Sequence, residues 1–217
     1  MARLQVTSTS IVVLGDVFAP SLLTPDLLRQ FFGDERPRGL TTNMVAHLEY
    51  PLSKYRVTLE EPKFQVLKLE PDPAQLEKLT DIVSHFLKKN PLVRVTAVGL
   101  NFEGFVAYAA GARAPRGQEQ NGERRFLETF AVLHALKELV GSDIRSGMLQ
   151  VIYQAEGHRC GLTLRSDAVL KDNKGVALDL NVHRAVSKRN EAKSHIDHLG
   201  DWLGYFVDLA ERLSRYV

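Results

Sequence analysis

The sequence predicts an α+β protein in which antiparallel strands form a sheet and amphipathic helices pack on one side of it. Strand-like segments in residues 43–69 are joined by connections of hairpin length, PLSK and EEPK, which favours an antiparallel meander. Two long segments, 73–89 and 194–216, each carry one apolar stripe at helical spacing. Apolar and polar side chains alternate in residues 176–186, which is typical of a sheet with one covered and one open face.

The composition is that of a globular chain that needs neither a metal nor a disulfide to fold. Of 217 residues 44% are hydrophobic, and 28 basic against 26 acidic residues leave a net charge of +2, which argues against a general nucleic-acid binder. Cys160 is the only cysteine, and no apolar run reaches the roughly 18 residues of a membrane span. We therefore expect a cytoplasmic protein with no cofactor, no membrane contact and one compact domain, residues 1–217.

The first half begins with a strand and a short helix. The alternation in residues 4–14 predicts a strand that ends at Gly15. Thr24 can accept hydrogen bonds from the free N–H groups of a helix start, and Pro25 suits the first helical position. The stretch 33–39, GDERPRG, stops this helix and predicts a loop.

A meander and a long helix complete the first half. The strands of the meander are expected at 43–49, 55–59 and 64–69. Pro62 should lie in a turn, because inside a ladder it would remove a hydrogen-bond donor. Asp72 and Pro73 mark a helix start, and Asn90 followed by a proline marks its end.

The second half is expected to use the same kinds of element. Residues 93–108 predict the central strand, 111–122 a flexible polar loop, and 123–140 an amphipathic helix. Three strands are expected at 148–155, 161–165 and 176–186. Residues 187–194 form a charged linker in this interpretation, and a capping-box pattern at Ser194 begins the last helix.

The order of elements suggests an internal duplication. Residues 1–92 and 93–217 both read strand, helix, three strands, long helix, although coincidence in a short α+β pattern is the alternative. This order resembles the duplicated arrangement of the TATA-binding-protein-like and helix-grip folds. The resemblance is one of topology and implies no activity and no site residue.

Polar rows on the open sheet face are the first candidate site. They could bind a ligand or a partner, and a plain solvated sheet face is the alternative. The candidate residues are Asn101, Glu103, Arg165, Asp179, Asn181 and His183.

Two basic loops are the second candidate. Together they could contact phosphates, although no aromatic side chains are interleaved and acidic residues dilute both loops. The candidate phosphate contacts are Arg113, Arg116, Arg124, Arg125, Arg184, Lys188 and Arg189.

Two smaller clusters could carry chemistry. His195, His198 and Asp201 would share one face of the last helix and could bind a metal ion, but a solvated helix face gives the same pattern. Cys160 and His158 would point the same way in a strand, although a lone cysteine is more often a small core residue.

The absence of a recognisable catalytic motif favours a non-catalytic binding or assembly protein that uses the open sheet face or a helix face. A protein partner or self-association is expected. The alternatives are a nucleic-acid-binding module using loops 113–125 and 184–193, and an enzyme of undetected type centred on His183, His158 or the last helix.

Overall fold

The computed structural model describes residues 4–108, 147–171 and 173–214. The predicted loop 111–122 and helix 123–140 lie outside the described residues, as do Arg113, Arg116, Arg124 and Arg125.

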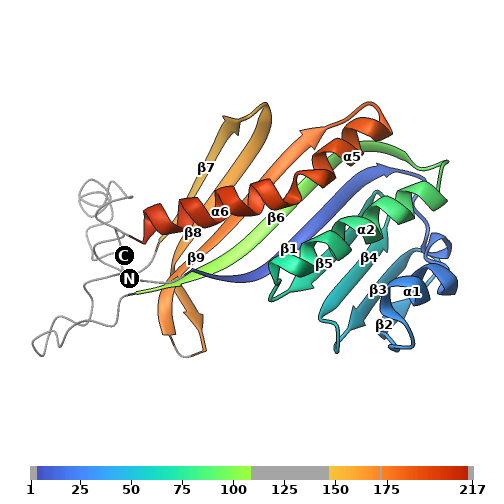
Figure 1. The fold of residues 1–217 in the computed structure, drawn as a ribbon, viewed down its shortest axis with the longest axis horizontal. Coiled ribbons are helices and arrows are strands. Elements are labelled where there is room, and N and C mark those ends of the chain that lie inside the picture. Colours follow the sequence, from blue (N-terminus) through green and yellow to red (C-terminus); the bar gives the residue numbers. More distant parts are fainter. Residues whose placement is uncertain (1–3, 109–146, 172, 215–217) are drawn as a thin grey trace, which may run out of the picture.

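Nine strands of the described residues form one sheet in the order β2-β3-β4-β5-β1-β6-β9-β8-β7, and every neighbouring pair is antiparallel (Figure 1). The strands are β1 Leu4–Asp16, β2 Arg38–Thr41, β3 Val45–Tyr50, β4 Tyr55–Glu60, β5 Lys63–Leu69, β6 Arg94–Ala107, β7 Met148–Ala155, β8 His158–Leu170 and β9 Asn173–Ala185. The α+β class and the antiparallel sheet are therefore confirmed.

The helices pack on one face of the sheet (Figure 1). They are α1 Pro25–Phe32, α2 Pro73–Lys89, α5 Arg189–Asp197 and α6 Leu199–Leu213, with a short 3-10 helix at Pro20–Leu22. Helix α2 contacts β1 and β5, α6 contacts β1, β6 and β9, and α2 contacts both α5 and α6. Their apolar stripes and the inner side chains of the strands form one core, in which Phe86, Phe102 and Phe206 are fully buried. None of the described helices has the length and apolar content needed to cross a bilayer.

The first half follows the sequence prediction closely. Thr24 caps α1 by accepting a hydrogen bond from the Leu27 N–H at 3.3 Å. Gly33 follows the helix with a φ of +60°, a backbone conformation that glycine adopts without steric strain. Pro62 lies between β4 and β5, so it removes no donor from the ladder.

Two predictions about local structure are wrong. The stretch 33–39 was expected to be a loop, but Arg38–Thr41 is an edge strand paired with β3. All four of its residues are exposed, so no burial pattern marked it. The linker predicted at 187–194 contains the start of α5, because the Glu191 carboxylate accepts hydrogen bonds from the Ser187 and Lys188 N–H groups.

The last helix also differs from its prediction. It does not begin at Ser194, and it is not continuous: α5 ends at Asp197, His198 is non-helical, and α6 begins at Leu199. The strand predicted at 161–165 is longer at both ends, because β8 pairs with β9 from Arg159 to Leu170.

Candidate functional site

The predicted polar row lies on the sheet face that no described helix covers. In the register between β6 and β9, Asn101 is opposite Asn181 and Glu103 is opposite Asp179. Their neighbours in sequence, such as Phe102 and Leu180, face the helices and are fully buried. Five of the six predicted residues thus occupy two adjacent central strands, and Arg165 comes from β8 beside them.

Amide and hydroxyl side chains in this row bond to one another across four strands. The Gln65 amide on β5 donates to the Ser10 Oγ on β1 at 3.3 Å, and the Asn101 amide donates to the same oxygen at 3.2 Å. The Asn181 amide in turn donates to the Asn101 Oδ1. These bonds fix the orientation of the side chains before anything binds.

Two carboxylates of the predicted polar row, Glu103 and Asp179, lie beside these hydrogen-bonded amides. Glu103 accepts a hydrogen bond from the Ser8 hydroxyl at 2.7 Å and is directly opposite Asp179. Desolvation raises the pKa of Asp179, and the charge of Glu103 raises it further, while Arg165 acts in the opposite direction. The pair borders a pocket of about 430 Å³ that Arg165, Phe105 and Val169 also line.

The same face carries exposed apolar side chains at its β7 edge. Met148 is 69% exposed and Ile152 is 58% exposed. Ile152 is opposite Gly161, and Gly161 is opposite Asn181, so a position without a side chain separates the apolar edge from the polar row. A Cβ added at Gly161 would meet no atom within 4 Å. The space above Gly161 is therefore open.

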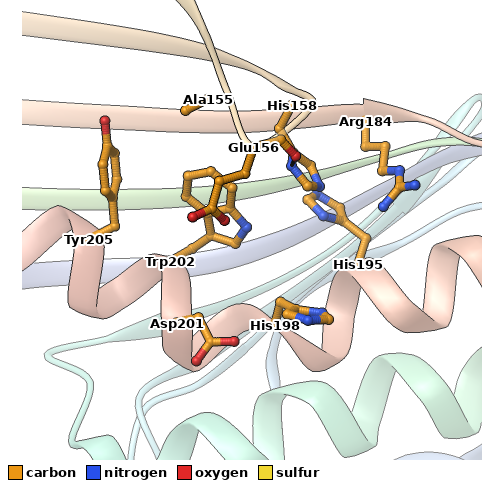
Figure 2. Close-up of a pocket in the computed structure, with 9 residues that line it drawn as sticks. All are labelled: Ala155, Glu156, His158, Arg184, His195, His198, Asp201, Trp202 and Tyr205. Atoms are coloured by element: carbon orange, nitrogen blue, oxygen red, sulfur yellow. Dashed lines mark hydrogen bonds between the residues drawn. The ribbon is translucent and has the colours of Figure 1, made fainter.

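A second pocket, of about 450 Å³, which we call the histidine pocket, lies on the helix side of the sheet, between the β7–β8 turn and the α5–α6 junction (Figure 2). The rings of His158 and His195 stack with centroids 4.7 Å apart, and Trp202 meets His158 edge-on at 5.2 Å. Tyr205 packs against Trp202, and its hydroxyl is 3.0 Å from the Tyr153 hydroxyl. The pocket is lined by Ala155, Glu156, His158, Arg184, His195, His198, Asp201, Trp202 and Tyr205.

His195 is the most perturbed group in this pocket. Its side chain is buried, with a relative exposure of 1%, and neither ring nitrogen has a hydrogen-bond partner among the described residues. Desolvation, followed by the electrostatic influence of the neighbouring His158 and Arg184, lowers the pKa of His195 to about 4. The Val182 backbone opposes this shift without forming a hydrogen bond of good geometry. The ring is therefore neutral at physiological pH.

The proposed metal ligands do not share one helical face, because the helix breaks at His198. His195 points toward His158, whereas the His198 Nδ1 bonds to the Ser194 carbonyl at 2.6 Å (Figure 2). Asp201 is exposed one turn further on. Within residues 4–108, 147–171 and 173–214, no three His, Cys, Asp or Glu side chains are placed to hold a metal ion.

The basic candidates that the structure describes have separate environments. Arg184 lines the histidine pocket, and Lys188 is exposed. The Arg189 guanidinium donates to the carbonyls of Leu87, Asn90 and Val93, the last two at 2.7 and 2.6 Å. Arg189 therefore joins the start of α5 to the end of α2 and the approach to β6.

Cys160 is fully buried, and burial raises the pKa of its thiol, so it lies in the core as a small apolar side chain. No local pattern in the sequence connects His158 with His195, or either histidine with Trp202 and Tyr205. The one available signal is the position of the single tryptophan, about one helical turn after His198 and two turns after His195.

Comparison with known proteins does not supply a family: no protein-family model matches this sequence, and no curated protein matches it.

Proposed function

We propose that this chain is a non-catalytic binding protein and that its recognition surface is the uncovered sheet face between β7 and β5. The partner is a protein. One set of cross-strand neighbours supports the proposal: Ile152, Gly161, Asn181 and Asn101. Ile152 is an exposed apolar side chain, and Gly161 beside it has no side chain. Asn181 and Asn101 follow and are hydrogen-bonded to each other.

This row has the composition of a protein interface. Protein interfaces combine apolar anchors, which carry much of the binding energy, with polar groups around them. Met148 and Ile152 supply the anchors, and the open space at Gly161 can accept a partner side chain. Because Asn101 and Asn181 already bond to each other, binding costs little additional side-chain entropy.

We further infer that the two halves derive from one duplicated unit. Two features support this inference: the order β3-β4-β5-β1 in the first half corresponds to β7-β8-β9-β6 in the second, and the two sets meet at the antiparallel pair β1–β6. The topological resemblance to the TATA-binding-protein-like and helix-grip folds belongs to the same inference. If the inference is right, residues 4–89 should superpose on residues 94–108, 147–171 and 173–213, with β1 on β6 and α2 on the last helices. A superposition that needs a different strand order contradicts duplication.

Nucleic-acid binding stays a prediction of the sequence, and no described contact favours it over a protein partner. Filter binding at low salt, with loss of binding as salt rises, would make it the better account.

The proposal is tested by comparing capture of the partner from an extract of the source cells by three variants. Ile152→Lys and Gly161→Val alter the row, and Leu40→Lys is the matched control, because Leu40 is also 58% exposed but lies on β2 at the opposite edge. We expect the first two variants to lose a captured protein that the wild type and Leu40→Lys retain. Equal capture by all four proteins contradicts the proposal. Thermal unfolding of each variant establishes that the fold is intact.

A further inference from the structure

The histidine pocket lies on the helix side, separate from the proposed recognition face, and its lining includes one buried, unsatisfied imidazole and one partly exposed guanidinium. His195 is buried with both ring nitrogens unpartnered among the described residues. Arg184 is partly buried and forms no hydrogen bond or ion pair within the described part of the chain. Buried polar groups are nearly always satisfied, so the unpartnered imidazole of His195 indicates a missing hydrogen-bond partner. The guanidinium of Arg184 in the same lining supplies the positive charge that an acidic partner would need.

The charges in the pocket are separated. Arg184 lies on one side of the stacked imidazoles, and Glu156 lies on the other, over Trp202 (Figure 2). The exposed Asp201 and His198 lie below, on the helix junction (Figure 2). With one guanidinium and two carboxylates in the lining, a multiply charged anion such as phosphate would meet net repulsion.

We propose that this pocket binds a small zwitterion, an α-amino acid or a molecule of that kind. Its carboxylate accepts hydrogen bonds from Arg184 and from the N–H of His195, and its ammonium group lies toward Glu156. The side chain of the ligand packs against Trp202 and Tyr205, which give the pocket its apolar wall.

The ligand class follows from the chemistry of each wall. A guanidinium binds a carboxylate through two parallel hydrogen bonds, and a neutral imidazole can add a third donor. A carboxylate in the protein supplies the counter-charge for an ammonium group. A volume of about 450 Å³ falls within the ordinary range for small-molecule sites.

Trp202 provides a direct readout, because it is the only tryptophan of the chain and it lines the pocket. Its fluorescence is followed while L-phenylalanine, L-leucine or L-glutamine is added to the full-length protein. Two analogues test the charges: 3-phenylpropionate lacks the ammonium group of phenylalanine, and 2-phenylethylamine lacks its carboxylate. We expect at least one amino acid to give a saturable change with a Kd below about 1 mM, and both analogues to bind at least about tenfold more weakly than phenylalanine.

Two arginine variants test whether the amino acid binds in the histidine pocket. Arg184→Gln should weaken amino-acid binding by about tenfold or more, which is the order expected when one charged hydrogen-bonding partner is lost. Arg159→Gln removes the same charge one residue from His158, from an exposed position on the opposite face, and should leave binding unchanged. The proposal is overturned if none of the three amino acids gives a saturable change, if 2-phenylethylamine binds as well as phenylalanine, or if the two arginine variants behave alike.

Discussion

The imidazole of His195 lies against the imidazole of His158, with ring centroids 4.7 Å apart and ring planes 18° from parallel. His195 lies in the last turn of α5, His158 is the first residue of β8, and Trp202 of α6 closes the cluster. This contact attaches the outer hairpin of the second half to the helix layer.

The stack predicts a loss of stability in mild acid. The pKa of His195 is about 4 in the folded protein against 6.5 for an ordinary histidine, so between these values the unfolded chain binds a proton that the folded protein does not. The free energy of unfolding should therefore fall as the pH is lowered through this window, by about 2 to 3 kcal/mol between about pH 7 and about pH 4.5. Urea titrations at about pH 7 and about pH 4.5 measure the fall.

His195→Gln is the control for this prediction, because glutamine is polar but does not titrate. The variant should be less sensitive to acid than the wild type over the same window. An equal fall in both proteins would assign the acid sensitivity to the carboxylates instead.

Arg189 is predicted to stabilise the fold. Arg189→Met removes the donor to three backbone carbonyls, and we expect unfolding to become easier by about 2 kcal/mol. Lys188→Met, at the exposed neighbouring position, should change stability by no more than about 0.5 kcal/mol. Chemical denaturation compares the two. If Arg189→Met retains its stability but loses nucleic-acid binding at low salt, the phosphate role inferred from the sequence is the right one.

Two strand glycines should respond differently to the same substitution. A Cβ at Gly175 would lie 2.3 Å from the Val106 carbonyl oxygen, so Gly175→Ala should cost about 1 to 3 kcal/mol. A Cβ at Gly161 meets nothing within 4 Å, so Gly161→Ala should be neutral or slightly stabilising. Thermal unfolding of both variants tests the prediction, and a destabilised Gly161→Ala would show that the space above Gly161 is not open.

Asp179→Asn should stabilise the protein at neutral pH. Desolvation and the opposing Glu103 raise the pKa of Asp179, so ionising it costs free energy as the pH rises above the ordinary aspartate range. Because Asp179 is exposed, solvent screens its interaction with Glu103, and we expect a gain of only about 0.5 kcal/mol. The gain should disappear at low pH, where Asp179 is protonated. A loss of stability at neutral pH would mean that the attraction to Arg165 outweighs the repulsion.

The sequence predicted the fold where local patterns and burial agree. Thr24 with Pro25, the turn at Pro62 and the stripe of α2 each have a local physical cause, and these elements form where expected. Prediction failed where tertiary contacts determine the secondary structure. All residues of β2 are exposed, and only its pairing with β3 makes it a strand. The polar start of α5 is likewise helical because Glu191 and Arg189 anchor it.

The candidate sites divide in the same way. Alternation alone was enough to place Asn101, Asp179 and Asn181 on one face, because a strand has a strict period of two. The histidine pocket combines residues from the β7–β8 hairpin, β9 and the helices α5 and α6. No local sequence pattern predicts that the hairpin near His158 will contact α5 at His195. The break at His198, which orients the two histidines differently, also has no proline or glycine at the break itself to announce it.

The proposed recognition face can be tested most directly by site-specific photo-crosslinking in the source cells. A benzophenone amino acid is placed at Ile152 on the uncovered face, or at the exposed Asp208 on α6 as the control on the helix side. We predict a discrete protein adduct from position 152 that Gly161→Val suppresses, and an adduct of twice the chain mass would identify the partner as a second copy. No adduct from position 152, or the same adduct from position 208, would contradict the assignment of this face.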